Sequence, residues 1–361
     1  MIIDIEKDNL RILVTGGAGF IGSCLVRRLL NTSKAKVFNV DKLSYASDLS
    51  SIQRSTNAEK HFHMQVNLND YEKTFSAVKE ADPDIIFHLA AESHVDRSIE
   101  NSKPFLESNI IGTFNILEST RKHWENMKLS RRERFKFIHI STDEVFGSLG
   151  LEGKFSEKTA YDPRSPYSAT KAASDHICNA WFHTYNLPII RTNCSNNYGP
   201  YQFPEKLIPL IIIKALRKEE IPIYGDGKNI RDWLFVEDHV DALLLAMQKG
   251  KIGSNYCIGG NNEKTNIEIA TSICKLLDKK KPSNESYENL IKYVKDRPGH
   301  DKRYAIDSSL IKRELGWKAK NSFQEGIVKT IEWYLSNQSW YENIQKKSGY
   351  KGTRIGLNKN S

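Results

Sequence analysis

Short apolar segments alternate with longer amphipathic stretches through the first half of the chain. Nearly continuous apolar runs are typical of parallel strands covered on both faces, and the stretches between them have helical length and spacing. This alternation predicts an α/β fold, a doubly wound parallel (Rossmann) sheet, which binds its ligands at the carboxyl ends of the strands. The expected strands are Arg11–Thr15, Lys36–Val40, His61–Val66, Ile85–Leu89, Phe135–Ser141 and Pro188–Asn193, and the expected helices lie near Gly22–Leu30, Tyr71–Lys79, Pro104–Trp124 and Tyr167–Tyr185.

After Tyr198-Gly199-Pro200 the pattern changes to short strands, turns and helices such as Asn266–Lys279 and Ser322–Leu335. A smaller C-terminal lobe that binds the substrate is therefore expected. The stretch from Trp233 to Gly260 again has the pattern of a helix followed by a strand, which predicts a return to the first sheet. The expected division is a first lobe of residues 1–198 and 233–260, a second lobe of residues 199–232 and 261–344, and a tail of residues 345–361.

The chain of 361 residues has a net charge of +9, and five of the positive charges lie in the tail, which contains no acidic residue. A charge run at a chain end predicts a solvated, disordered segment, and no basic face interleaved with aromatic residues is visible elsewhere. The longest apolar run, Leu207–Ile213, is broken by Pro209 and is far too short to span a membrane. Neither a nucleic-acid partner nor a membrane partner is expected. The basic residues of the tail are Lys346, Lys347, Lys351, Arg354 and Lys359.

Five cysteines are scattered along the chain without a C-x-x-C pair, which fits reduced thiols in the cytoplasm better than disulfides or a zinc site. His61 and His63 form an H-x-H pair on an expected strand, but no third ligand clusters near them. No metal is therefore expected. His88, His139 and His176 are interpreted as packed or hydrogen-bonded residues.

A glycine-rich turn follows the first expected strand and precedes the first expected helix. Gly17, Gly19 and Gly22 satisfy G-x-G-x-x-G, which lets the backbone turn tightly and approach a pyrophosphate at the helix N-terminus. Asp41 closes the second expected strand, where a carboxylate accepts from ribose hydroxyls and repels a 2′-phosphate. The context predicts a dinucleotide site that favours NAD over NADP, although Lys42 follows Asp41 directly.

Two tyrosines have a lysine four residues later, a spacing that places both side chains on one face of a helix. Tyr224 and Lys228 flank a Gly-Asp-Gly turn, so that match is interpreted as accidental. Tyr167 and Lys171 lie in a stretch without a helix breaker after Pro166, which suits the first turn of a helix. Because an ammonium group near a phenol favours the phenolate, this pair predicts a catalytic base.

The acidic pair Asp143 and Glu144 follows Ser141 and Thr142 where the fifth strand should end. Consecutive residues of a strand face opposite ways, so both carboxylates can reach one substrate only if the backbone leaves strand geometry there. Two acids in one cleft can divide the work, one protonated as an acid and one ionised as a base.

Several longer motifs together carry a family resemblance. They read T-G-G-A-G-F-I-G, H-L-A-A-E-S-H-V-D-R-S, S-T-D-E-V-F-G, Y-S-A-T-K, N-C-S-N-N-Y-G-P, P-E-K-L-I-P-L, I-R-D-W and D-R-P-G-H-D. From about Arg11 to Tyr341 the chain resembles the dTDP-glucose 4,6-dehydratase family of the extended short-chain dehydrogenase/reductases. The first and fourth motifs are shared across that superfamily, whereas the Asp-Glu pair and the second-lobe motifs are more specific.

The resemblance implies a lyase of nucleotide-sugar metabolism that works by internal oxidation and reduction. Tyr167, helped by Lys171, would take the proton from the 4-hydroxyl of the sugar while a hydride passes from C4 to NAD, and Thr142 would hydrogen-bond that oxygen. The new ketone acidifies C5–H, so that Glu144 can remove this proton while Asp143 protonates the departing 6-hydroxyl. Return of the hydride to C6 then gives a 4-keto-6-deoxy sugar.

The resemblance also implies which residues contact each ligand. Contacts to NAD are expected from Gly16, Gly19, Phe20, Ile21, Gly22, Asp41, Lys42, Leu43, Ser44, Asn67, Leu68, Leu89, Ala90, Ala91, Ser108, Tyr167, Lys171 and Asn197. Contacts to the nucleotide-diphosphate sugar are expected from Ser93, Thr142, Asn196, Lys206, Leu207, Pro222, Ile223, Tyr224, Arg231, Asn266, Asp296, Arg297 and His300. The cations among them, Lys206, Arg231 and Arg297, suit a diphosphate. Asn67 stands where the family usually has an acidic residue beside the adenine; since asparagine keeps an acceptor oxygen, weakened rather than lost NAD binding is expected.

Other functions remain open at this stage. An epimerase, a decarboxylase or a dehydratase of another nucleotide sugar would share Tyr167 and Lys171, and neither of the first two needs the Asp143–Glu144 pair. An inactive NAD-binding scaffold should have a broken Tyr-Lys pair or damaged glycines, and both are intact. The resemblance further implies a homodimer built from the helices Pro104–Trp124 and Tyr167–Tyr185, which are apolar around more than a single stripe.

Overall fold

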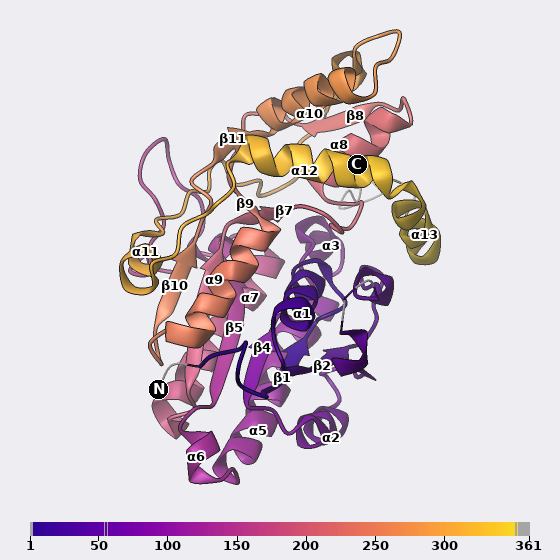
Figure 1. The fold of residues 1–361 in the computed structure, drawn as a ribbon. Helices are drawn as coiled ribbons and strands as arrows, with labels where there is room; N and C mark the ends of the chain where they lie inside the picture. The colour runs from indigo at the N-terminus through magenta and orange to yellow at the C-terminus, as the bar shows by residue number, and fades with distance from the viewer. Residues whose placement is uncertain (1–2, 54, 56, 351, 353–361) are drawn as a thin grey trace.

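The computed structural model describes residues 3–53, 55, 57–350 and 352, and it has a larger and a smaller lobe (Figure 1). Within these residues the larger lobe contains a seven-stranded sheet in which every neighbouring pair is parallel. The predicted doubly wound fold and all six predicted strands are confirmed. In spatial order the strands are β3 (His61–Gln65), β2 (Lys36–Asp41), β1 (Arg11–Thr15), β4 (Ile85–His88), β5 (Lys136–Thr142), β6 (Ile189–Cys194) and β10 (Asn255–Ile258).

Helices cover both faces of this sheet because successive strand residues point to opposite sides. Ile12 and Val14 of β1 belong to the core on one face, while Leu13 between them belongs to the core on the other. The first face is covered by α1 (Phe20–Thr32) and α9 (Val236–Lys249). The second face is covered by α2 (Tyr71–Ala81), α5 (Gly112–Glu125) and α7 (Pro166–Tyr185).

Two helices of the second face have local features that position side chains for the site. Ser165 caps α7 in a capping box, and Pro166 occupies its first turn, so the helix starts one residue before Tyr167. The helix expected over Pro104–Trp124 is interrupted, because a π-helical segment, Leu106–Ile111, separates α4 (Lys103–Phe105) from α5. Asn109 in this segment binds the backbone of Glu92, accepting from its N–H at 2.8 Å and donating to its carbonyl at 3.0 Å.

The smaller lobe has its own core and lies beyond the carboxyl ends of the strands (Figure 1). It contains a parallel ribbon, a small sheet and several helices. The ribbon is β8 (Ile221–Tyr224) with β12 (Ile291–Val294), the sheet has the order β11 (Glu263–Thr265), β9 (Ile230–Phe235) and β7 (Asn196–Tyr198), and the helices are α8 (Leu207–Leu216), α10 (Asn266–Lys280) and α12 (Phe323–Ser336). After the small sheet the chain returns to the large one, since α9 leads into β10, which pairs with β6.

Three segments lie in the other lobe from the one expected. Strand β7 and residues 233–235 of β9, assigned from sequence to the first lobe, belong to the small sheet of the second. Helix α11 (Ser309–Leu315), assigned from sequence to the second lobe, packs on the first, where Ile311, Leu315 and Trp317 join the core beneath α1 and α9. The remaining short elements are α3 (Val95–Glu100), α6 (Leu129–Arg132) and the 3₁₀ turns η1 (Leu49–Ser51), η2 (Ala58–Lys60), η4 (Asp143–Phe146) and η5 (Tyr287–Leu290).

The prediction of a disordered tail from residue 345 is wrong at its start. Helix α13 (Gln338–Ser348) runs through Gln345, Lys346 and Lys347, and Tyr350 is buried against Phe203. Apolar side chains explain this, because Ile344 and Tyr350 supply one buried face that the charge pattern conceals. Lys351, Arg354 and Lys359 lie outside the described residues.

No helix in the described part of the chain combines the length and the apolar character that a membrane crossing needs. Likewise, within those residues no three metal-ligating side chains of His, Cys, Asp or Glu gather closely enough to hold an ion. The predicted packing of two histidines is confirmed: His88 lies between the hydroxyls of Thr15 and Thr113, and His139 is fully buried against Asp175.

Candidate active site

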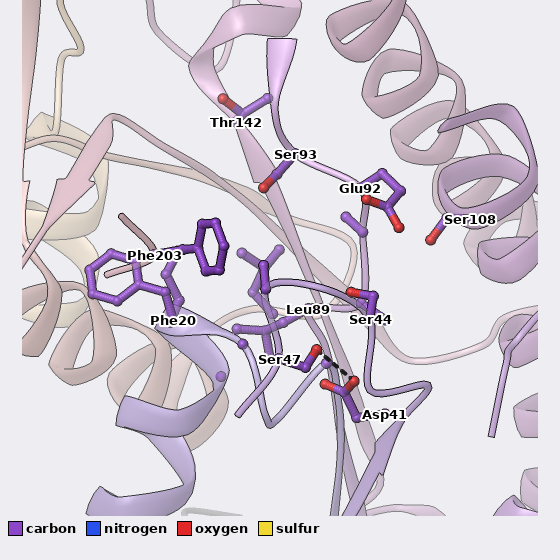
Figure 2. A pocket seen from close by; sticks show the side chains of 18 of the residues that line it. Phe20, Asp41, Ser44, Ser47, Leu89, Glu92, Ser93, Ser108, Thr142 and Phe203 are labelled. Atoms are coloured by element: carbon purple, nitrogen blue, oxygen red, sulfur yellow. Dashed lines mark hydrogen bonds between the residues drawn. The ribbon is translucent and has the colours of Figure 1, made fainter. Parts of the chain in front are cut away.

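A cleft of about 300 Å³ opens at the carboxyl ends of β1, β2, β4, β5 and β6, where a doubly wound sheet is expected to bind its ligand. Figure 2 shows Phe20 and Phe203 on one side of it and Glu92 and Ser108 on the other. The cleft brings together most of the residues predicted for NAD. Those that line it are Gly16, Gly19, Phe20, Ile21, Gly22, Asp41, Lys42, Ser44, Asn67, Leu68, Leu89, Ala90, Ala91, Ser108, Tyr167, Lys171 and Asn197.

The glycine turn leaves no room for side chains at three of its positions, Gly16, Gly17 and Gly22. Gly16 has a φ of +72°, and a Cβ there would lie 2.7 Å from the backbone nitrogen of Ala90. A Cβ on Gly22 would lie 2.1 Å from the carbonyl oxygen of Gly16, whereas one on Gly19 would meet that oxygen at 3.3 Å. Gly17 faces away from the cleft, toward Asn39. The turn therefore presents bare backbone and the N-terminus of α1 to the cleft, as a pyrophosphate requires.

Asp41 ends β2 and braces the neighbouring loops. One carboxylate oxygen accepts from Leu43 N at 2.8 Å and from Ser47 Oγ at 2.9 Å, and the other accepts from Ala18 N at 3.1 Å (Figure 2). Leu43 itself lies outside the cleft lining. Lys42 donates to Glu92 Oε1 at 2.6 Å, so its charge is already compensated and does not offer a 2′-phosphate a free cation.

Asn67, the departure from the family pattern, lines the cleft after β3. Its side-chain oxygen accepts from Asn69 N at 3.2 Å, which leaves that oxygen a second lone pair for a ligand. The position can therefore still accept a hydrogen bond, although without the charge of a carboxylate.

Tyr167 and Lys171 lie one turn apart on α7, and both are buried. The Lys171 ammonium donates to the carbonyl of Ile140 on β5 at 2.8 Å. Burial, and then the negative charge of Glu144, raise the pKa of Tyr167 well above its ordinary value. In this structure burial and Glu144 therefore favour the protonated phenol of Tyr167.

The acidic pair leaves strand geometry as predicted, since the 3₁₀ turn η4 starts directly after β5. Thr142 caps this turn, accepting from Glu144 N at 3.3 Å and donating to Asp143 Oδ1 at 3.3 Å. Glu144 lines the cleft, while Asp143 lies behind it with 1% of its surface exposed.

The two acids have different electrostatic surroundings. Burial, followed by the charge of Glu144, raises the pKa of Asp143 well above its usual range. Burial also raises the pKa of Glu144, but the positive charges of Arg297, Arg231 and Lys206 oppose this rise. Burial and the charge of Glu144 thus favour the protonated form of Asp143, whereas three cations favour ionisation of Glu144, which is the division of labour that an acid and a base require.

The predicted substrate contacts fall into two groups. Ser93, Thr142, Asn196 and Lys206 line the cleft, and Lys206 Nζ donates to the carbonyl of Ser93 at 2.9 Å. The other group lies on the second lobe beyond the cleft lining and comprises Leu207, Pro222, Ile223, Tyr224, Arg231, Asn266, Asp296, Arg297 and His300.

Contacts distant in sequence organise this second group. Asp96 accepts from Arg297 Nη1 at 2.8 Å and from Tyr224 Oη at 3.2 Å. His300 Nδ1 lies 2.7 Å from Asp296 Oδ1. Ile223 is fully buried in the second-lobe core, so it can offer a substrate only its backbone.

Sequence reasoning missed several residues of the cleft wall. Glu92 and Glu205 lie inside motifs already recognised and could have been found there. Tyr45 donates to Glu205 Oε1 at 2.8 Å, and its ring lies under the guanidinium of Arg97. No local sequence pattern predicts either contact. The other missed lining residues include Ala46, Ser47, Cys194, Ser195, Gln202 and Phe203.

Comparison with known proteins agrees with this geometry. The family model described as GDP-mannose 4,6 dehydratase matches residues 13–330. A probable dTDP-glucose 4,6-dehydratase of Sinorhizobium fredii is 51% identical over 348 residues, which cover 96% of this chain and 99% of that protein. This chain belongs to the dTDP-glucose 4,6-dehydratase family.

Solved structures of the dTDP-glucose 4,6-dehydratase family have the same fold. The enzyme of Bacillus anthracis, in complex with NAD, has a TM-score of 0.82 and 42% identity, covering 92% of this chain and 99% of its own. The enzyme of Streptomyces venezuelae, with NAD and TYD bound, has a TM-score of 0.84 and 38% identity, with the same coverage of 92% and 99%. The resemblance inferred from the motifs is thereby confirmed.

Proposed function

We propose that this protein is a hydro-lyase, an NAD-dependent dTDP-glucose 4,6-dehydratase that forms dTDP-4-keto-6-deoxyglucose. The observation that carries the proposal is the meeting of two catalytic sets at one cleft. Tyr167 and Lys171 come from α7, and Thr142, Asp143 and Glu144 come from the end of β5 and the turn after it. An epimerase needs the first set but has no use for a buried protonated acid beside a base.

NAD fits the residues of the cleft. The glycine turn leaves backbone room for the pyrophosphate, and Asp41 ends β2 where the adenosine ribose of a dinucleotide is bound. The relatives from Bacillus anthracis and Streptomyces venezuelae were solved with NAD bound. When bound, NAD would supply the hydride acceptor for C4 and the hydride for C6, while the proton that Glu144 removes from C5 would return to that carbon.

Tyr167 takes the proton of the sugar's 4-hydroxyl in the first half of the reaction. The Lys171 ammonium stabilises the phenolate that does this, because an opposite charge nearby favours the ionised form. Thr142 lies beside the pair at the end of β5, where its hydroxyl can bind the same sugar oxygen. With NAD as the hydride acceptor, these groups let the 4-hydroxyl become a ketone. The oxygen of that ketone remains hydrogen-bonded to them.

Elimination of water follows from the acid and the base. The C4 ketone acidifies C5–H, and Glu144, which faces the cleft, removes that proton. Asp143 keeps its own proton through burial and delivers it to the departing 6-hydroxyl. The positive charges of Lys206, Arg231 and Arg297 favour the ionised form of Glu144 in this structure. The same cations also suit the diphosphate of the substrate.

Mass spectrometry of the product formed from dTDP-glucose tests the proposed function. A product lighter by one water, formed without net accumulation of NADH, is the expected result. An isomer of the substrate would show an epimerase instead, and loss of carbon dioxide from a uronate substrate would show a decarboxylase. Parallel incubations with UDP- and GDP-glucose identify the preferred base.

Replacing Asp41 by Ala is expected to narrow the preference for NAD over NADP. The change removes the ribose acceptor and the charge that repels a 2′-phosphate, while Lys42 stays paired with Glu92. The measurement is the dissociation constant of NAD and of NADP for the parent protein and for Asp41→Ala, and the ratio of the two constants gives the preference of each protein. If the parent protein binds NADP more tightly than NAD, the role assigned to Asp41 is wrong.

We also propose that the protein is a homodimer built from the helices of the second sheet face. Leu106, Ile111 and Phe114 are between 41% and 48% exposed, and Phe114 packs edge-on against Trp181 of α7. Apolar side chains gathered on adjoining helices mark an interaction surface. The motif resemblance implies a second copy of this chain as the occupant.

Light scattering of the parent at micromolar concentration is expected to give twice the chain mass, and Phe114→Glu is expected to give the monomer mass. Leu129→Glu is the matched control, because Leu129 is 70% exposed on α6, outside these helices. A monomeric parent, or a Phe114→Glu variant that stays dimeric, would contradict the proposal.

A cytoplasmic location is proposed on the state of the thiols. All five cysteines are buried and none is paired within the described residues, and free thiols persist in a reducing compartment.

A further inference from the structure

Asp175 is a fully buried carboxylate that the proposed reaction does not use. It lies on α7 one turn beyond Lys171, and α7 packs along β5. Ionised carboxylates are rarely buried unless they are paired and hydrogen-bonded. Its oxygens accept hydrogen bonds from His139 Nε2, Ser141 Oγ and Tyr161 Oη at 2.9 Å each, and from Asn193 Nδ2 at 3.2 Å.

These partners join α7 to the strands that carry the catalytic groups. His139 and Ser141 belong to β5, and Asn193 belongs to β6. The same Asn193 amide also donates to the carbonyl of Thr142 at 2.9 Å. Asp175 is therefore connected through one side chain to the residue that starts the Thr142-Asp143-Glu144 segment.

Asp175 also bears on the charge of Lys171. Burial lowers the pKa of Lys171, and the negative charge of Asp175 opposes that effect. Burial alone would raise the pKa of Asp175, but the hydrogen bonds from His139 and Ser141 and the positive charge of Lys171 bring it below its ordinary value. His139 is neutral, since burial lowers its pKa to about 4. The other titratable groups that face these residues or Tyr167 are His88, Arg191, Tyr161, Cys178, Cys194, Asp143 and Glu144.

We propose that Asp175 is a positioning residue of the dehydration, which compensates the buried charge of Lys171 and holds α7 against the strand end that carries Thr142. This inference rests on the proposed function, because it assigns Asp175 a part in making Tyr167 a base. It predicts an effect of the Asp175 charge that can be measured separately from the effect of its hydrogen bonds.

The charge effect has a definite sign. The Tyr167–Lys171 pair is reactive as phenolate with ammonium and unreactive as phenol with amine. Both forms carry one titratable proton, so the pKa values seen in a rate profile belong to the pair and not to either residue. Removing an anion makes loss of the first proton easier, which moves the acid limb of the rate profile to lower pH. Because Asp175 is closer along α7 to Lys171 than to Tyr167, its loss also shifts the one-proton form toward phenol with amine.

Asp175→Asn is the test, since the amide keeps the shape and removes the charge. We expect the acid limb of kcat/KM for dehydration to move about one pH unit lower. A neighbouring opposite charge commonly shifts a pKa by at least about that much, and this variant removes such a charge. The rate on the plateau should fall roughly tenfold, because a shift of one pKa unit changes the equilibrium between the reactive and the unreactive one-proton forms about tenfold. KM for the nucleotide sugar should change little, because Asp175 lies outside the cleft lining.

Tyr161→Phe is the matched control. It removes one hydrogen bond to the same carboxylate but leaves the charge, so its acid limb should remain that of the parent. An Asp175→Asn limb that stays in place, or moves to higher pH, would overturn the proposal while the parent still dehydrates its substrate. A parent without dehydration would instead overturn the proposed function.

A stability measurement keeps the test decisive if Asp175→Asn folds poorly. That variant buries an uncompensated ammonium, and the double variant Lys171→Met/Asp175→Asn removes it. The double variant should therefore unfold at a higher temperature than Asp175→Asn alone. Equal or lower stability of the double variant would show that the two charges are not coupled.

Discussion

Asp143→Asn combined with Glu144→Gln is expected to lower turnover at least about 10²–10⁴-fold, the range that general acid–base groups typically contribute. The amides keep most of the shape of the acids and remove their proton transfer. Oxidation at C4 should partly survive, because its base lies on α7 rather than on η4. In a single turnover the double variant should accumulate enzyme-bound NADH together with a 4-keto, 6-hydroxy sugar.

Tyr167→Phe provides the comparison for this experiment. Without the phenol the first proton is not removed, so neither NADH nor a dehydrated product should form. Release of dehydrated sugar by the Asp143/Glu144 double variant at near the parent rate would show that these carboxylates are not the acid and the base. The pair would then be interpreted as an ordinary acidic turn.

Gly22→Ala is expected to weaken NAD binding by up to about a hundredfold. The new Cβ would lie 2.1 Å from the carbonyl oxygen of Gly16 and 2.8 Å from the Cα of Gly17, so the turn itself would have to move. Overpacking typically costs about 1–3 kcal/mol, and the upper end of that range corresponds to a loss of affinity on the order of a hundredfold. Titration calorimetry with NAD measures it directly.

A graded series of glycine replacements makes that result specific. Gly19→Ala should weaken NAD binding less, since its Cβ would meet only the Gly16 oxygen at 3.3 Å. Gly150→Ala should leave binding unchanged, because a Cβ there has no atom within 4 Å. Parent-like affinity of Gly22→Ala would mean that the turn is not the pyrophosphate cradle.

The sequence predicted those parts of the molecule that depend on local pattern. Apolar runs located the strands, the glycine spacing located the turn before α1, and the Tyr167–Lys171 spacing held because Ser165 and Pro166 start a helix there. The departure from strand geometry at Asp143 was also foreseeable, since two adjacent acids at a strand end cannot otherwise face one ligand.

Contacts between distant segments were not predictable in this way. Arg297 meets Asp96 across 201 positions of the chain, and Tyr45 meets Glu205 across 160, without any periodic signal. The raised pKa of Tyr167 depends on how deeply α7 and η4 bury it, which a spacing does not reveal. Helix α13 was missed because lysines dominate the composition of this segment, while Tyr341 and Ile344 supply the buried face of the helix and Tyr350 packs just beyond its end.

The return of the chain to the large sheet has a consequence for how such proteins can be recombined. The chain leaves the first lobe after β6, re-enters it with α9 and β10, and re-enters it again with α11. A chimera that takes its sugar-binding half from a relative therefore needs compatible junctions at every crossing. A fragment ending at Tyr198 would lack β10 and leave β6 as an uncovered edge, which invites pairing with other chains. New sugar specificity is accordingly more accessible through point changes in the second lobe than through exchange of whole segments.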